Sequence, residues 1–202
     1  MPRHTRLIIP NIYHHALHRQ DVFHDHNDRF YYLEWARKLA EQNHVPITGY
    51  CLMTNHIHLL ILPQNTDGLI NFMKLLAQRY TQYFNRKYHR SGKLWENRYK
   101  LIPFDPETYY VVLKYIEMNP VRAGLVSDGA TYPWSSASYH LLGKENQTIM
   151  ADCLHDSIFS YKRFFYEEEV TEDLEAIRTS AQQGKAWGKP AFLEELANSL
   201  DR

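Results

Sequence analysis

Hydrophobic residues recur along the chain with two different spacings, and each spacing predicts one type of element. Short runs rich in β-branched and aromatic residues predict strands at residues 7–17, 45–53, 57–62 and 94–104. Apolar positions repeated every three or four residues predict helices at residues 27–42, 69–87 and 106–118. The predicted order is therefore strand, helix, strand, strand, helix, strand, helix.

Local signals support several of these boundaries. Asn27 is a residue type that caps helix starts, and it stands at the beginning of the first predicted helix. Only a short polar break, Thr54-Asn55, separates the strands predicted at residues 45–53 and 57–62, which indicates an antiparallel hairpin. Pro120 ends the last helix, because the residue before a proline disfavours helical backbone.

This order of elements predicts an α+β fold. It is the order of a ferredoxin-like antiparallel sheet with helices on it, here with one added helix. Beyond about residue 145 the pattern predicts short helices at residues 161–166 and 192–200 around an acidic connector. We therefore predict a catalytic domain at residues 1–145 and an acidic C-terminal helical extension at residues 146–202. Such a fold by itself implies no function.

The composition is that of a globular protein that works inside the cell. Hydrophobic residues make up 44% and charged residues 23% of 202 residues, with 15 tyrosines. The longest apolar run, at residues 59–62, is far too short to span a membrane, and the start of the chain does not resemble a signal peptide. Cys51 and Cys153 make no disulfide framework. We expect a cytoplasmic protein.

The net charge of zero hides two oppositely charged segments. Residues 71–100 carry eight basic residues and one acidic residue, a net charge of +7. Residues 151–202 carry six basic and eleven acidic residues, a net charge of −5. Local charge decides whether a phosphate partner binds, so the basic segment is compatible with nucleic-acid binding or with an ordinary solvated helix face.

Two histidines on one predicted strand are the first candidate chemical group. Side chains alternate along a strand, so His56 and His58 point to the same face. Two imidazoles held on a rigid strand form half of a metal site. From these residues alone, a pair of structural histidines at a strand end is the alternative.

A tyrosine and an asparagine at the end of the third predicted helix are the second candidate group. Tyr115 and Asn119 are four residues apart and therefore share a helix face. The amide oxygen of Asn119 can bind a hard divalent cation, which would place the Tyr115 phenol one turn away. Ordinary packing of the tyrosine is the alternative.

Several motifs, in this order along the chain, carry a resemblance to a known family. They are GYCLMTNHIH at residues 49–58, LWENRYK at 94–100, YIEMNPVRAGLV at 115–126 and YPWSS at 132–136. Together they resemble the REP-associated tyrosine transposases of the HUH nuclease superfamily, which are similar to small insertion-sequence transposases with one tyrosine. The resemblance covers roughly residues 5–142.

The resemblance implies an HUH domain that cleaves and rejoins single-stranded DNA near hairpin-forming repeats with Mg²⁺ or Mn²⁺. By position, Tyr115 becomes the nucleophile, and His56 and His58 become metal ligands. Asn119 becomes the third ligand, at a position where the small insertion-sequence transposases typically have Gln. Attack of the tyrosine on phosphorus would form a 5′-phosphotyrosine and free a 3′-hydroxyl.

The expected partner is single-stranded or hairpin DNA, with no membrane and with a monomer or homodimer as the acting unit. In such a protein, cations mixed with aromatic side chains suit single strands, because phosphates need charge and unstacked bases need a flat partner. We also expect association with the nucleoid. The predicted DNA-binding residues are Arg79, Lys93, Arg98, Lys100 and Arg122.

Two other functions remain open from the sequence. A DNA-binding regulator of the same fold would no longer cut, although it would have no need of Tyr115 and the histidine pair. A metal-dependent hydrolase would use activated water and a further ligand at the histidine pair, for which His44 or Glu117 is available.

Overall fold

The computed structural model describes residues 12–17, 20–95, 100–151, 154 and 158–200, and its elements follow the predicted order. The strands are β1 (Ile12–Leu17), β2 (Ile47–Leu52), β3 (His56–Ile61) and β4 (Lys100–Pro103). The first helices are α1 (His26–Asn43), α2 (Thr66–Lys87), α3 (Tyr109–Glu117) and α4 (Asn119–Arg122). Further along lie α5 (Ala137–Leu142), α6 (Ile158–Tyr166), α7 (Thr171–Gln183) and α8 (Pro190–Leu200). Among the described helices, none combines the length and the apolar character needed to cross a membrane.

The four strands form one antiparallel sheet in the order β2-β3-β1-β4. Strand β3 lies between β2 and β1, so the unit β1-α1-β2 is split, and β4 pairs with the other edge of β1. This is the ferredoxin-like topology that the order of elements predicts. The hairpin of β2 and β3 is confirmed as well. Of the strand predicted at residues 7–17, the first five positions lie outside the described residues.

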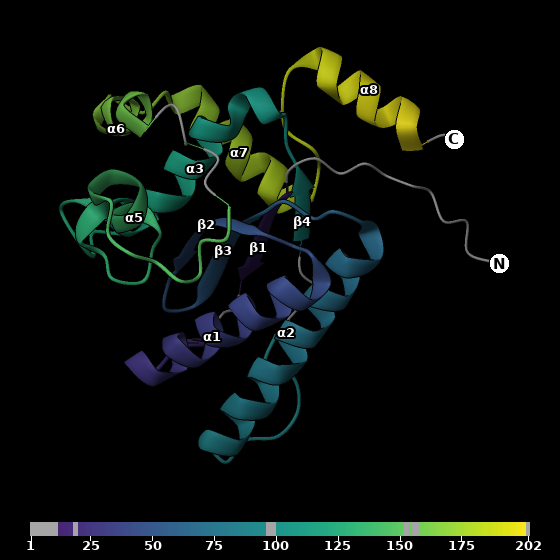
Figure 1. The fold of residues 1–202 in the computed structure, drawn as a ribbon, viewed down its shortest axis with the longest axis vertical. Helices are drawn as coiled ribbons and strands as arrows, with labels where there is room; N and C mark the ends of the chain where they lie inside the picture. The colour runs from purple at the N-terminus through teal and green to yellow at the C-terminus, as the bar shows by residue number, and fades with distance from the viewer. Residues whose placement is uncertain (1–11, 18–19, 96–99, 152–153, 155–157, 201–202) are drawn as a thin grey trace.

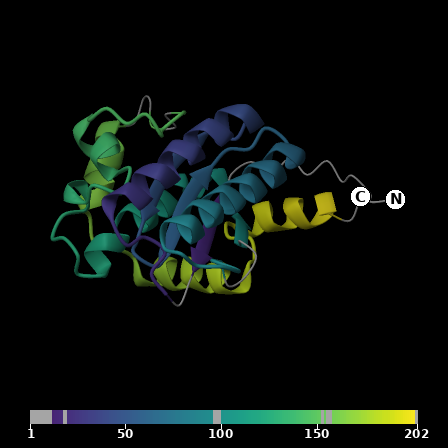
Figure 2. The same ribbon diagram turned by 90° about the horizontal axis from the view of Figure 1, so that it is seen from below.

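Helices cover both faces of the sheet (Figures 1 and 2). Helices α1 and α2 pack together on one face, whereas α3 packs against β2 and β3 and α7 against β4 on the other. Every residue of β2 is buried, and so is every residue of β3 after His56. Because both faces are covered, buried residues follow one another along these strands instead of alternating with exposed ones.

Two details of the first helix differ from the prediction. Asp25, and not Asn27, caps α1: its carboxylate accepts from the Asp28 N–H, and the Asp28 carboxylate accepts from the Asp25 N–H. This reciprocal pair satisfies two N–H groups that a helix start leaves open. Phe30, one of the apolar residues whose spacing predicts the helix at residues 27–42, is 63% exposed, and its ring lies edge to face with that of Trp134, with the ring centroids 4.9 Å apart.

The third predicted helix is divided in the structure. Residues Pro106–Thr108 form a 3-10 turn capped by Asp105, and the α-helix begins at Tyr109. It ends at Glu117, and the chain resumes as the single turn α4 after Met118. Pro120 stands in the first turn of α4, where its missing N–H is tolerated, so it begins a short helix as well as ending the longer one.

The C-terminal extension contains one helix more than the sequence pattern predicts. Helix α7 occupies the acidic connector, where only a narrow apolar stripe marks its buried side, with Ile177 and Ala181 in the core. Tyr161 and Phe165 of α6 belong to the same hydrophobic cluster as the sheet. The extension therefore packs against α3 and β4, while the division at residue 145 stays a prediction.

One polar cluster joins the start of α1 to the end of α2. The Lys87 ammonium donates to Asp25 Oδ2 at 2.8 Å and to Asp28 Oδ1 at 2.6 Å, and Asp28 is fully buried. Tyr88 also donates to Asp28 Oδ2 at 2.8 Å. Burial opposes ionisation of Asp28, but the hydrogen bonds from Lys87, Tyr88 and nearby backbone N–H groups lower its pKa overall.

We expect Lys87→Met to lower the free energy of unfolding by about 3 kcal/mol at pH 7, because it leaves the buried Asp28 carboxylate without its cation. Since the pKa of Asp28 is lower in the folded chain, its contribution is present above the unfolded value near 3.8 and is lost as the pH falls through the folded pKa. Urea unfolding of both proteins should show the difference shrinking below about pH 4. Lys38→Met is the control, because its exposed pair with Glu34 contributes at most about 0.5 kcal/mol. Equal losses for the two variants would refute this role of Lys87.

Candidate functional site

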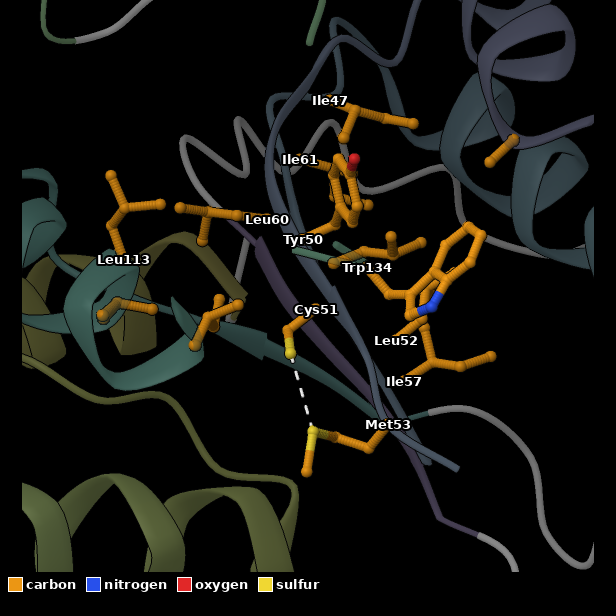
Figure 3. Packing of buried hydrophobic residues seen from close by; sticks show 14 of the residues in the cluster. Ile47, Tyr50, Cys51, Leu52, Met53, Ile57, Leu60, Ile61, Leu113 and Trp134 are labelled. Atoms are coloured by element: carbon orange, nitrogen blue, oxygen red, sulfur yellow. Dashed lines mark hydrogen bonds between the residues drawn. The ribbon is translucent and has the colours of Figure 1, made fainter. Parts of the chain in front are cut away.

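Strand β3 carries the histidine pair on the face of the sheet that α3 covers. Alternation places His56, His58 and Leu60 on this face, while Ile57 faces the opposite side. Figure 3 shows Leu60 directed toward Leu113 of α3, with Ile57 on the other side of the strand. The helix comes close because Gly49 of β2 has no side chain: a Cβ there would lie 2.6 Å from Leu113 Cδ1.

The structure brings the two histidines and Tyr115 together. The ring centroids of His56 and His58 are 4.9 Å apart, with their planes at 90°. The ring centroids of His58 and Tyr115 are 6.2 Å apart at 86°. His58 and Tyr115 are both buried, and His56 is half-buried at the start of the strand. The site therefore lies on the covered face of the sheet, and its most exposed member is His56.

The surroundings of His56 suit a metal ligand. Burial lowers the pKa of His56 to about 4, so the ring is neutral at pH 7, as a ligand imidazole must be. Its Nδ1 lies 2.7 Å from Asn55 Oδ1. Because an amide oxygen only accepts, this contact assigns the proton to Nδ1, so Nε2 is the ring nitrogen that carries the lone pair.

Of the three tyrosines on α3, Tyr115 is the one beside the histidines. The Tyr110 ring lies against Tyr161 and Phe164 of α6, at centroid distances of 5.5 and 6.3 Å. The Tyr109 ring contacts Phe104 at 6.4 Å. Helical geometry explains this separation, because at about 100° per residue Tyr110 and Tyr109 lie about 140° and about 120° around the helix from Tyr115.

Asn119 lies one turn beyond Tyr115, at the first residue of α4. Its amide nitrogen donates to the carbonyl oxygens of Tyr115 at 2.8 Å and Ile116 at 3.2 Å. These bonds close the end of α3 and fix the amide. Both bonds are donated by the amide nitrogen of Asn119, and the amide oxygen is the atom that could bind a cation.

Glu117 is turned away from the histidine pair into the core. Its carboxylate accepts from Ser136 Oγ at 2.5 Å, from His140 Nδ1 at 2.6 Å and from the Tyr161 hydroxyl at 2.8 Å. Ser136 also bonds the backbone of Tyr50 on β2. No local pattern in the sequence predicts this network, although the YPWSS motif contains Ser136. Glu117 thus links α3 to β2, α5 and α6.

Arg122 and Lys114 connect the tyrosine helix to the C-terminal extension. The guanidinium carbon of Arg122 lies 4.7 Å from the Tyr115 ring centroid, and Arg122 NH1 pairs with Glu169 Oε1 at 2.6 Å. The buried Lys114 ammonium donates to the carbonyl oxygens of Phe164 at 2.9 Å and Glu167 at 2.7 Å. Burial lowers the pKa of Lys114. Neither contact was predicted, since both join residues about fifty positions apart.

Among the other predicted DNA-binding residues, those that the structure describes make their contacts away from Tyr115. Arg79 stacks on Trp35 in the layer of α1 and α2, on the opposite face of the sheet, with its guanidinium carbon 4.5 Å from the ring centroid. Lys93 is exposed in the segment that follows α2. Lys100 begins β4 and donates to the Gln182 carbonyl of α7. Arg98 lies outside the described residues.

The donor set at the histidine pair fits a divalent cation that takes part of its coordination from substrate. Within the described residues, no three side chains among His, Cys, Asp and Glu gather as a ligand group. His44 follows α1, before β2, and thus lies at the opposite end of the hairpin from His56. Two imidazoles, with the Asn119 amide oxygen as the third ligand expected from the sequence, would leave coordination positions for phosphate oxygens and water.

Comparisons with known proteins agree with this fold. A Haemophilus influenzae strain Rd protein named as a REP-associated tyrosine transposase is 30% identical over 97 residues, which is 43% of this chain. The match spans 55% of that relative, about half of its length. The solved structure of a REP-associated tyrosine transposase bound to a REP hairpin aligns over 75% of this chain and 92% of its own. The TM-score is 0.53 and the sequence identity is 15%, so the two proteins share a fold.

The family assignment rests on a longer match. Residues 10–119 fit the sequence profile of the IS200-like transposases. That segment runs from β1 to the start of α4 and includes the histidine pair, Tyr115 and Asn119. It is more than half of the 202 residues, and the chain therefore belongs to the IS200-like transposase family.

Proposed function

We propose that this chain cleaves and rejoins single-stranded DNA next to hairpin-forming repeats, with Tyr115 as the nucleophile. The observation that carries the proposal is the position of the Tyr115 ring, 6.2 Å from the ring of His58 and on the same face of the sheet as both histidines. Family membership supports DNA breakage and joining as the reaction class. The hairpin bound by the solved relative supports a folded DNA repeat as the partner.

His56, His58 and the amide oxygen of Asn119 would hold Mg²⁺ or Mn²⁺. A cation bound there supplies Lewis-acid chemistry at the scissile phosphate. The two rings stand on one rigid strand, and Asn55 orients the first of them, so the nitrogen ligands are preorganised. Asn119 is held by its two bonds to the end of α3.

The proposed reaction is a transesterification between Tyr115 and the scissile phosphodiester of the DNA. The Tyr115 oxygen attacks phosphorus, and the bond from phosphorus to the 3′-oxygen breaks. The phenol gives up one proton and the departing 3′-oxygen takes up one, so the products are a 5′-phosphotyrosine and a free 3′-hydroxyl. The bond energy stays in the covalent link, and attack by a 3′-hydroxyl reverses the step and reseals DNA without a nucleotide cofactor.

The covalent intermediate is the direct test of this proposal. The protein is incubated with single-stranded hairpin DNA from repeats of its own genome, with Mg²⁺ or Mn²⁺, and the reaction is resolved under denaturing conditions. A protein–DNA band that needs the cation, with the nucleotide mapped to Tyr115 by mass spectrometry, is the expected result. Cleavage with no covalent band would favour a hydrolase. DNA binding with neither cleavage nor band would favour a non-cutting regulator.

We propose Lys93 as a phosphate contact. It is exposed and precedes β4 in the chain, and Lys100, the first residue of β4, lies in register with His58 because both pair with His15 of β1. On a single strand each phosphate contact changes the slope of log affinity against log salt by about −0.7. Lys93→Ala should therefore flatten the slope by about 0.7 in fluorescence anisotropy titrations at several salt concentrations. Lys38→Ala is the control, because it removes a cation of α1, a helix on the face of the sheet away from the histidines (Figure 1). A slope unchanged by Lys93→Ala would place the DNA path elsewhere.

A further inference from the structure

Arg122 is held over Tyr115 by three contacts that all lie within the protein. Its NH2 group donates to the Tyr115 carbonyl oxygen, and its guanidinium carbon lies 4.7 Å from the centroid of the Tyr115 ring. Its NH1 group pairs with Glu169 Oε1 at 2.6 Å. The guanidinium thus contacts both the backbone and the ring of the proposed nucleophile, and Glu169 holds it from the other side.

Glu169 belongs to a short connection, residues 167–170 between α6 and α7, which is itself anchored to the tyrosine helix. The Lys114 ammonium, one position before Tyr115, donates to the Phe164 and Glu167 carbonyl oxygens where α6 ends. Lys114 is buried, so these two carbonyl bonds replace most of the water that would otherwise solvate its ammonium. The connection therefore cannot shift without breaking contacts on both sides of Tyr115.

The pair of Arg122 and Glu169 is well shielded from solvent. Their side chains are 16% and 17% exposed, far less than an ordinary surface pair. A hydrogen-bonded pair of charges in such a setting resists separation, since either group alone would remain poorly solvated. A phosphate that approached Arg122 would have to displace the Glu169 carboxylate.

We propose that Glu169 is a positioning residue for the Tyr115 nucleophile and acts through Arg122; this inference rests on the function proposed above. Glu169 fixes the guanidinium, and the guanidinium fixes the ring plane and the backbone of Tyr115. In-line attack on phosphorus requires the phenol oxygen within a narrow range of positions, and a displacement of about 1 Å can cost on the order of 100-fold in rate. The acidic extension thereby contributes a positioning residue that lies outside the match to the family profile, which ends at residue 119 of this chain.

The experiment separates DNA binding from the covalent step. Glu169→Gln removes the charge and keeps the shape, and Glu168→Gln is the matched control, since Glu168 is its exposed neighbour. We measure the affinity for hairpin DNA in EDTA and the single-turnover rate of covalent-complex formation at saturating DNA and cation. Glu169→Gln should keep the affinity and lower the rate by about tenfold or more. Glu168→Gln should change neither, and Glu169→Asp should recover part of the rate.

Arg122→Lys is the second variant, and its outcome does not depend on the stability of Glu169→Gln. Lysine keeps the charge but lacks the fork that reaches Glu169 and Tyr115 together, so the covalent step should slow while the affinity stays. A wild-type rate in Glu169→Gln would overturn the proposal. A faster rate would also overturn it, because the carboxylate would then compete with the DNA phosphate. Weaker binding with an unchanged rate in Arg122→Lys would make Arg122 a phosphate contact. If the wild type formed no adduct, the proposed function would fail instead.

Discussion

Replacing Tyr115 with phenylalanine should abolish the covalent complex and DNA cleavage together, while hairpin affinity and the fold remain. The substitution removes one oxygen and keeps the ring that contacts His58 and Arg122, so packing on the sheet is preserved. The oxygen is the attacking atom in the proposed reaction, and no other group replaces it. We expect the covalent band and the free 3′-hydroxyl product to fall below detection in a denaturing gel, with an unchanged melting temperature.

Tyr110→Phe is the matched control for this experiment. It removes the same atom from the same helix, but its ring faces Tyr161 and Phe164 of α6 instead of the histidines. This variant should cleave DNA at the wild-type rate. A covalent band that survives Tyr115→Phe and disappears in Tyr110→Phe would move the nucleophile. Cleavage that survives Tyr115→Phe without any band would point to attack by water.

Replacing either histidine with alanine should lower cation-dependent cleavage by at least about 100-fold, because residues that merely support ligands already cost 10–100-fold in metal affinity or activity. The two imidazoles lie next to each other, and the His58 ring lies beside the proposed nucleophile Tyr115. His56→Ala is the cleaner variant, since His56 is half-buried at the strand start, whereas His58 is buried and its removal leaves a cavity. Mn²⁺ titration by electron paramagnetic resonance and single-turnover cleavage measure the two losses.

His44→Ala controls for the loss of a histidine as such. His44 is exposed after α1, at the end of the hairpin away from His56, so its removal should leave Mn²⁺ binding and cleavage intact. Cleavage by His56→Ala at the wild-type rate would exclude the histidine pair as the metal site. A loss in His44→Ala as large as in His56→Ala would show that the effect is not specific to the pair.

The local pattern of the chain was enough to predict the sheet and the parts of the site that lie on single elements. The period of the apolar residues predicted β2, β3 and α2 within a few positions, because each buries a continuous face. The alternation of a strand alone puts His56 and His58 on one face. The ferredoxin-like order followed from the order of the elements, since few antiparallel arrangements satisfy it.

Other features depended on contacts between distant segments. Helix α7 has few apolar residues, so the spacing of apolar positions did not predict it, and its buried Ile177 and Ala181 belong to a helix that packs against α3 and β4. Asp25 became the cap of α1 through a reciprocal bond with Asp28, which Lys87 of another helix also holds. The sequence predicts Lys100 and Arg122 as DNA-binding cations. In the structure Lys100 donates to the Gln182 carbonyl oxygen, and Arg122 pairs with Glu169, both in the extension.

What the sequence determined by itself is the set of chemical groups and the face of its own element on which each one stands. The tertiary structure alone decided which faces meet: Tyr115 reaches His58 across 57 positions of the chain because Gly49 lets Leu113 of α3 pack directly on the sheet. The tertiary structure alone also paired Glu169 with Arg122. The physical reason is that periodicity reports whether a face is buried, whereas the partner that buries it depends on shape and on loop paths that no local pattern contains.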